Sequence, residues 1–496
     1  MVSASFWWRG HRWTLTFAAL ALALGAVVGV AAETIVLLSA PTGSRPTFYL
    51  ELFFAGIVGV ALLLLLVSRV KAGLPLVLAV LAFLPSRTGM QLKIYDPIVI
   101  SASDIVAVLG FIILMLHTKA LRKERLQPFV ISLPLWIWVV VGIVGSLVAV
   151  ARGVPWANTI AELKGFYLSI LVVLLCVNLI RTWATLRLVL IVAVVSALPD
   201  VLFQYRDASE GTSAVQVTLA NGVTFDRTAG GAGALNQYAF YLMVVFFLSI
   251  GLGLAARHRV ARLFFFACAA FFSAGIILTY TRGAWLATAL GLVVLGVAGG
   301  WRVLAGLAAS GAVASYFIPP TVWQRLNFSD HSAQERFAFA HTALAVIRAN
   351  PFVGGGWGSN FYMLGDNLIP TFFRADLPIW HDDYLIVATQ VGLPGLAVFL
   401  WILGALIWAA LRAYLRAPAG ALRASLLALL AAFIAMCAQS LTEMFFWIPQ
   451  VSPMVWLVIG LMCATINLAN NEAVPAALGS RRSTSDERDA ALSSVA

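Results

Sequence analysis

The sequence predicts an all-α, polytopic integral membrane protein. Hydrophobic residues make up 61% of the 496 residues and charged residues only 11%, and the mean hydropathy is +0.94. A soluble globular protein cannot bury that much apolar surface, whereas a bilayer accepts it along every lipid-facing helix. Long apolar runs such as 131–150 and 396–411 therefore indicate membrane spans.

Apolar segments of membrane-spanning length recur along the chain. A span needs about 20 apolar residues, and by this rule we expect about 12–14 transmembrane helices. The expected spans are 13–38, 48–68, 73–85, 97–117, 128–150, 165–181, 186–204, 236–255, 261–280, 283–299, 302–318, 384–411, 423–443 and 451–469. Segment 73–85 is short enough for a half-helix. The first span has no small-residue cleavage site, so we expect it to be retained.

The distribution of basic residues predicts the orientation in the membrane. Lys and Arg concentrate in alternate loops, around Arg9, Arg69, 119–125, 257–262 and 412–423. Cytoplasmic loops carry this excess, so both termini are expected in the cytoplasm. The net charge of +11 then follows from topology and does not indicate nucleic-acid binding. The four cysteines lie in apolar runs, which favours packing over disulfides or a metal site.

The expected spans divide the chain into six regions. These are the N-terminal transmembrane helices (1–204), an outer loop (205–235), central transmembrane helices (236–318), a large outer loop (319–383), C-terminal transmembrane helices (384–469) and a cytoplasmic tail (470–496). The tail is polar, and we expect it to be disordered. Both outer loops, which would be periplasmic in a bacterial inner-membrane protein, are longer than ordinary connections, which favours a function for them.

Each long loop contains one predicted element. In the first, residues 215–225 alternate around Asn221-Gly222, which predicts a β-hairpin with a type I′ turn. In the second, a capping box starts at Ser332 and a helix is expected to run to Asn350-Pro351. Apolar residues recur in it at helical spacing, at Phe337, Ala340, Leu344 and Ile347. This pattern predicts an amphipathic helix in or near the membrane interface.

Three arginines on the predicted outer face, Arg227, Arg282 and Arg336, are candidates for substrate binding. Basic residues are disfavoured on this face, so their presence needs a reason. A guanidinium binds phosphate through two parallel hydrogen bonds and keeps its charge, which suits a pyrophosphate at the headgroup level. Gly230, Gly231 and Gly233 precede a helix start, where free N–H groups favour an anion. The alternative is that each arginine is a membrane anchor or an ion-pair partner.

His381, followed by Asp382 and Asp383, begins the apolar segment after the large loop. Imidazole titrates near neutral pH, and a flanking carboxylate can orient it as a general base. The three residues could instead ligate a divalent metal, although adjacent residues rarely share one ion. A third interpretation is a histidine with only a structural role at the interface.

Taken in order, these motifs resemble the O-antigen ligase and polymerase superfamily over roughly residues 225–400. The motifs are Arg227 with its Gly-rich run and Asn236, Thr281-Arg-Gly-Ala-Trp285, Arg336 ahead of Asn350-Pro-Phe-Val-Gly-Gly-Gly-Trp-Gly358, and His381-Asp-Asp-Tyr-Leu385 with Gly392-Leu-Pro-Gly395. The sequence departs from the family pattern at Asp382, often Asn or Ser, at Thr281, usually Ser, and at Leu235, often Pro.

The resemblance implies a GT-C-like, metal-independent glycosyltransferase of the bacterial inner membrane that needs no cofactor. Ligases of this family transfer O-antigen polysaccharide from undecaprenyl diphosphate to the lipid A–core oligosaccharide on the periplasmic face, in lipopolysaccharide biosynthesis. His381 would act as the base, and Arg227, Arg282 and Arg336 would hold the diphosphate. The residues expected to line the substrate site are Gly230, Gly231, Gly233, Asn236, Gly355, Gly356, Asp382 and Tyr384.

Two other functions remain open from the sequence. An O-antigen polymerase or a protein O-oligosaccharyltransferase would use the same donor with a different acceptor. A lipid-linked glycan transporter would place charges near the middle of its spans and would have broken helices in matched halves. The charges here cluster at the outer ends of the spans, which disfavours the transporter.

Overall fold

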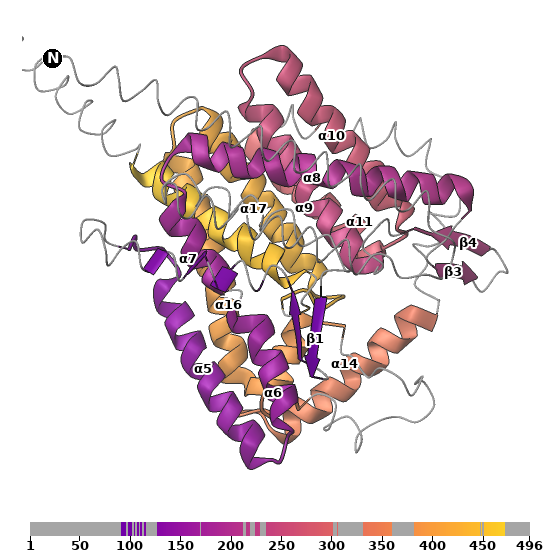
Figure 1. Ribbon diagram of the computed structural model, residues 1–496, viewed down its shortest axis with the longest axis vertical. Helices are drawn as coiled ribbons and strands as arrows, with labels where there is room; N and C mark the ends of the chain where they lie inside the picture. The colour runs from indigo at the N-terminus through magenta and orange to yellow at the C-terminus, as the bar shows by residue number, and fades with distance from the viewer. Residues whose placement is uncertain are drawn as a thin grey trace, which may run out of the picture.

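Helices dominate the structure, a computed structural model of the chain (Figure 1). It describes residues 91–95, 98–101, 126–168, 170–211, 215–218, 224–228, 235–300, 331–359, 381–446 and 451–471, with isolated positions at 104–115, 305 and 448. Nine helices in these described ranges are long and apolar enough to cross a bilayer. The predicted class, an all-α polytopic membrane protein, is therefore confirmed.

The described helices follow the predicted spans from residue 128 onward. They are α5 (Ser132–Ala151), α6 (Trp156–Leu163), the π-helix η2 (Lys164–Leu168), α7 (Ile170–Leu179), α8 (Trp183–Glu210), α9 (Leu235–Ala255), α10 (Arg259–Leu278), α11 (Arg282–Gly299), α14 (His331–Ala349), α16 (Asp383–Arg416), α17 (Ala421–Gln439) and a last span, Ser452–Asn471. The predicted spans 13–38, 48–68, 73–85 and 302–318 lie outside the described residues, apart from position 305. The total number of spans stays a prediction.

Two short hairpins accompany the helices. β1 (Gln91–Tyr95) pairs antiparallel with β2 (Ile98–Ser101), so the span predicted at 97–117 is wrong in its first residues. β3 (Val215–Thr218) pairs antiparallel with β4 (Thr224–Arg227), with Val215 opposite Arg227. This pair lies where the sequence predicts a hairpin, and its turn residues lie outside the described part of the chain. β4 places Arg227 beside the ends of the helices.

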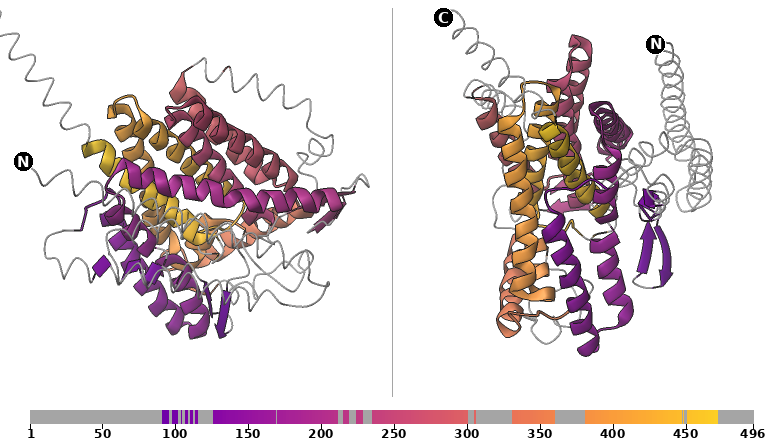
Figure 2. Two further views of the ribbon diagram at one scale, coloured as in Figure 1. Left: turned by 45° about the horizontal axis from the view of Figure 1, so that its top comes forward. Right: turned by 90° about the vertical axis from the view of Figure 1, so that its left-hand side faces the viewer.

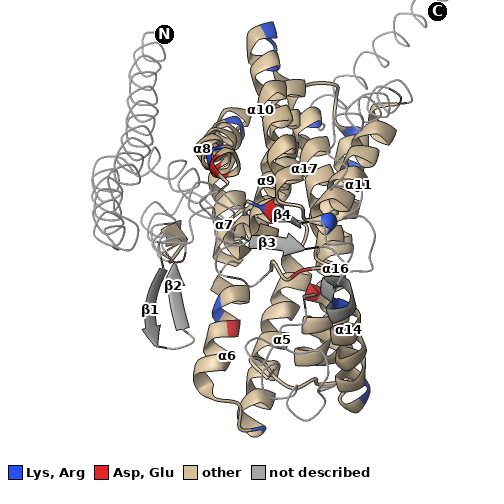
Figure 3. Cartoon of the chain, turned by 90° about the vertical axis from the view of Figure 1, so that its right-hand side faces the viewer, with Lys and Arg blue, Asp and Glu red and all other residues tan. Residues whose placement is uncertain are grey.

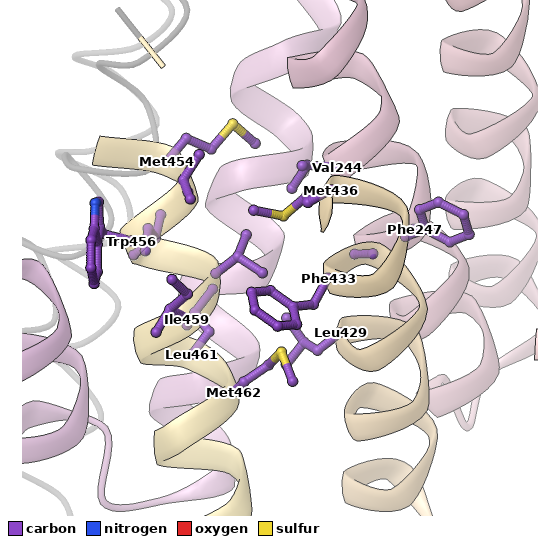
Figure 4. Packing of buried hydrophobic residues seen from close by; sticks show 14 of the residues in the cluster. Val244, Phe247, Leu429, Phe433, Met436, Met454, Trp456, Ile459, Leu461 and Met462 are labelled. Atoms are coloured by element: carbon purple, nitrogen blue, oxygen red, sulfur yellow. The ribbon is translucent and has the colours of Figure 1, made fainter. Parts of the chain in front are cut away.

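The core of the bundle lies where α9, α17 and the last span meet. Val244 and Phe247 of α9, Phe433 and Met436 of α17, and Trp456 of the last span are almost completely buried. In Figure 4, Val244, Phe433 and Met436 lie between these helices, whereas Trp456 lies on the side of the last span that faces away from α17. Both α9 and the last span are apolar on all sides, as expected of helices surrounded by other helices. These helices supply much of the buried core in the described part of the chain.

The segment α16 folds back on itself, so the membrane crossing predicted at 384–411 is present but is confined to the second part of this segment. Gly392 has φ 75° and ψ 178°, which breaks the helix into arms 383–391 and 393–416. The ring centroids of Tyr384 and Phe399 are 6.0 Å apart. Fifteen residues of straight helix would separate their backbones by about 22 Å, so the two arms must lie side by side. Only the long arm, which packs along α5, crosses the bundle (Figure 2, right).

The helix predicted in the large loop is present as α14, which lies across the direction of α5 and α16 (Figure 1). It begins at His331, one residue before the predicted cap. Its buried face is Phe339, Ala343 and Val346, whereas Phe337 and Leu344 of the predicted apolar stripe are exposed. The helix is thus apolar on two sides, one packed on the protein and one exposed, and contact of the exposed side with a membrane interface stays a prediction.

Candidate active site

Six side chains from separate segments form one hydrogen-bonded network. They are Arg227 at the end of β4, Asn236 in the first turn of α9, Thr281 just before α11, Arg336 in α14, His381 just before α16 and Glu443 just after α17. Figure 3 shows charged residues of both signs gathered at this level, between β4 and α14. The structure therefore brings together four residues that the sequence singled out: Arg227, Asn236, Arg336 and His381.

Glu443 lies at the centre of the network. Its Oε1 accepts hydrogen bonds from Arg336 Nη2 at 2.7 Å and from Asn236 Nδ2, and its Oε2 lies 3.0 Å from His381 Nδ1. Burial alone would raise the pKa of Glu443, but hydrogen bonds and charge interactions with His381 and Arg336 hold this pKa below its usual range. A buried carboxylate with these partners is ionised at neutral pH.

Arg227 occupies the other end of the network. Its Nε donates to the carbonyl oxygen of Thr279 at 2.8 Å, and its Nη2 donates to Asn236 Oδ1 at 3.1 Å and to Thr281 Oγ1 at 3.0 Å. The planar guanidinium can donate to three acceptors in this fixed arrangement, whereas the ammonium group of lysine lacks that planar geometry. Asn236 thus connects Arg227 with Glu443, because its amide group contacts both.

Arg282 is the first residue of α11 and is only 6% exposed. Thr281 precedes it as the N-cap but makes no side-chain hydrogen bond to its own helix, because its hydroxyl faces Arg227 and Asn236. The first N–H groups of α11 are therefore not capped by Thr281. A helix start that lacks a cap from its N-cap residue, beside the buried Arg282 and the half-buried Arg227, favours an anion.

Backbone strain lies beside this network. Among the described residues, Tyr280 (φ 50°) and His381 (φ 41°) are the non-glycine residues with positive φ. Such a backbone is unfavourable for a bulky side chain by roughly 1–3 kcal/mol and persists where the surroundings enforce it, often at functional sites. Both residues are next to or within the network, which supports a functional role for this location.

The carboxylates of Asp382 and Asp383 both accept hydrogen bonds from backbone N–H groups. Asp382 caps α16, because its Oδ1 accepts from the N–H groups of Tyr384 (2.8 Å) and Leu385 (2.9 Å), and burial raises its pKa to about 6. Asp383 is completely buried and accepts from the N–H groups of Phe445 and Phe446. In the part of the chain that the structure describes, no three His, Cys, Asp or Glu side chains are grouped as for a metal ion.

Three other predicted substrate contacts have structural partners. Tyr384 Oη donates to the carbonyl oxygen of Cys437 at 2.7 Å. The N–H groups of Gly355 and Gly356 donate to Thr389 and Gln390 in the short arm of α16. A Cβ atom on Gly356 would lie 2.5 Å from Ala149 Cα, so this glycine allows close packing against α5. Among the described contacts, Gly355 and Gly356 bond to the short arm of α16 and do not join the network, so their role at the substrate stays a prediction.

The predicted contacts Gly230, Gly231 and Gly233 lie outside the described residues. Sequence reasoning missed Glu443, the residue that joins the two halves of the network. One signal could have found it, since no other acidic residue occurs between Asp383 and Glu472. A lone carboxylate at the end of a membrane span is expensive to bury and therefore often functional.

Part of the chain matches a known protein family. Residues 267–400 match the family model described as O-antigen ligase. This match supports an O-antigen ligase family assignment. The matched range of the O-antigen ligase model contains Arg282, Arg336 and His381, while Arg227, Asn236 and Glu443 lie outside it. No curated protein matches the chain. The match and the candidate membrane helices together indicate a multi-pass membrane protein with a function of the O-antigen ligase or polymerase type. Proteins of this type are similar to membrane glycosyltransferases.

Proposed function

We propose that this chain is an O-antigen ligase that transfers a polysaccharide from undecaprenyl diphosphate to a hydroxyl of the lipid A–core oligosaccharide. The reaction takes place on the periplasmic face of the inner membrane. The connected network of His381, Glu443, Arg336, Asn236 and Arg227 carries the proposal, because it joins a base to a cluster of positive charge. Transfer from a lipid diphosphate needs both groups.

His381 acts as the general base in this proposal. Its Nδ1 faces the ionised Glu443, which favours the tautomer with the proton on Nδ1. Nε2 is then the nitrogen that accepts the proton of the acceptor hydroxyl. The hydroxyl oxygen forms a bond to the anomeric carbon while the bond from that carbon to the diphosphate breaks. Glu443 orients the ring and stabilises its positive charge, as the carboxylate of a catalytic triad does.

The arginines hold the leaving group. Arg336 pairs with Glu443, the one carboxylate of the network. Arg227 joins the network through Asn236 and Thr281, and Arg282 directly follows Thr281, so the local charge favours an anion. When the glycosidic bond breaks, negative charge develops on the diphosphate oxygen, and fixed cations in a site of low dielectric stabilise it. These residues supply the charge stabilisation and the base from the chain itself, so no cofactor is part of the proposal.

Reconstituted transfer tests this function. The purified chain is mixed with undecaprenyl diphosphate-linked glycan and lipid A–core acceptor, and the product is followed by gel mobility. His381→Ala should lower the rate at least about 100-fold, the usual contribution of a general base. His341→Ala is the matched control, because this histidine is exposed on α14 and should leave the rate unchanged.

Two outcomes would overturn the proposal. Turnover of His381→Ala near the wild-type rate would exclude the base. Glycan chains that lengthen without any core acceptor would instead indicate a polymerase.

A further inference from the structure

We propose that Asp383 is a positioning residue, which holds Glu443 at hydrogen-bonding distance from His381 by binding the backbone of the segment that carries Glu443. The inference rests on the proposed function, since it assigns a role within the same site. It explains why the second aspartate of the His-Asp-Asp motif is buried, which helix capping and metal binding do not explain.

The contacts of Asp383 join the two segments that meet at the base. Its Oδ1 accepts from the N–H groups of Phe445 at 3.1 Å and Phe446 at 3.3 Å, and its Oδ2 accepts from Phe445 N at 3.0 Å. Its own N–H donates to the carbonyl oxygen of Ser440 at 3.0 Å. Asp383 therefore holds the chain on both sides of Glu443.

This placement links two residues that are distant in sequence. His381 and Glu443 are 62 positions apart, and their side-chain atoms are 3.0 Å apart. Asp383 lies two residues after His381, and Phe445 lies two residues after Glu443, so one carboxylate fixes the separation of the two backbones. Displacements of about 1 Å in a catalytic site can lower the rate by about 100-fold.

Capping of α16 does not explain Asp383. Asp382 already caps this helix through its bonds to Tyr384 N and Leu385 N. Asp383 is completely buried, and burial of a carboxylate is unfavourable unless hydrogen bonds compensate it. The compensating donors belong to the segment that carries Glu443, so the arrangement fits a role in placing that residue.

A double-mutant cycle tests the inference in the full-length protein. Asp383→Asn keeps one acceptor oxygen and should lower kcat by about 10- to 100-fold with KM nearly unchanged, because a misplaced base weakens only the transition state. If Asp383 acts through Glu443, the same change in a Glu443→Gln background should lower kcat less than about 2-fold. The kcat of Asp383→Ala should be lower than that of Asp383→Asn, because alanine removes both acceptor oxygens.

Hydrogen exchange at residues 440–446 gives a readout that does not depend on activity. Exchange at Phe445 and Phe446 should accelerate in Asp383→Ala and stay unchanged in Asp104→Asn. The latter is a matched control, because Asp104 is a buried aspartate that pairs with Lys164 at 2.6 Å. Asp104→Asn should lower thermal stability without a change in KM.

The outcomes separate this inference from the proposed function. Equal losses from Asp383→Asn in the wild-type and Glu443→Gln backgrounds would refute positioning through Glu443, as would unchanged hydrogen exchange. Wild-type activity in both His381→Ala and Glu443→Gln would instead refute the proposed mechanism, whatever Asp383 does.

Discussion

At the scale of single residues, the charge of each side chain and the direction of its hydrogen bonds define this site. Arg227 binds three acceptors with two of its nitrogens, and two of these acceptors, Asn236 and Thr281, also contact each other. A charge held in one orientation stabilises a developing anion without reorganisation during the reaction. Orientation as well as charge should therefore matter at this position.

Arg227→Lys tests the orientation. Lysine keeps the positive charge but loses the planar fork, so kcat/KM for glycan transfer should fall about 10- to 100-fold, from the loss of one or two charged hydrogen bonds. Arg348→Lys is the control, because Arg348 lies exposed in the last turn of α14 and should show wild-type kinetics. Equal activity of Arg227→Lys and the wild type would mean that charge alone suffices.

At the scale of elements, the fold-back of α16 places His381. The Gly-rich segment 352–358 packs against its turn, and the N–H of Leu393 donates to the carbonyl oxygen of Pro351 at 2.8 Å. Gly392 has a backbone conformation found almost only in glycine. The conformation of one residue thus directs the short arm back along the long arm and toward Glu443.

Gly392→Ala should destabilise the protein by at least about 2 kcal/mol, because the backbone is unfavourable for alanine. In addition, the new Cβ would lie 2.5 Å from the carbonyl carbon of Phe352. Thermal unfolding in detergent measures the effect. Gly404→Ala is the control in the same helix, since open space surrounds that position. It should be neutral or stabilising by up to about 1 kcal/mol. Equal melting temperatures for the two variants would contradict the assigned fold-back.

At the scale of the whole molecule, orientation connects the site to its substrates. Ser209 lies at the end of α8 toward β3, and Arg257 lies between α9 and α10, so the two positions should lie on opposite sides of the membrane. The distribution of basic residues predicts that Arg257 is cytoplasmic and that Ser209 shares the periplasmic side with the site.

Cysteine labelling in intact cells checks this orientation. A membrane-impermeant maleimide should label Ser209→Cys, which is exposed, and should label Arg257→Cys only after permeabilisation. The unmodified chain is the control, because its cysteines are buried or only partly accessible. The reverse pattern would place the site in the cytoplasm and exclude an acceptor on the periplasmic face.

Local sequence patterns predicted the elements that local physics controls. Apolar length located the described spans, alternation around a turn located β3 and β4, and helical spacing located α14. The arginines and His381 stood out because an ionisable group beside an apolar span needs a partner. The same local reasoning missed the reversal within 384–411, where one glycine turns the chain back. It also did not reveal that Gly355 and Gly356 pack against segments distant in sequence.

Composition and periodicity alone therefore determined a polytopic membrane protein with ionisable groups at the ends of its spans, because lipid solvation acts on each segment independently. Tertiary structure alone decided which of these groups meet. Glu443 contacts Asn236 across 207 positions and Arg336 across 107, and such pairs depend on how helices pack and where α16 turns back. Hydrogen bonding between distant segments, which no local pattern encodes, assembled His381, Glu443, Arg336 and Arg227 into one network.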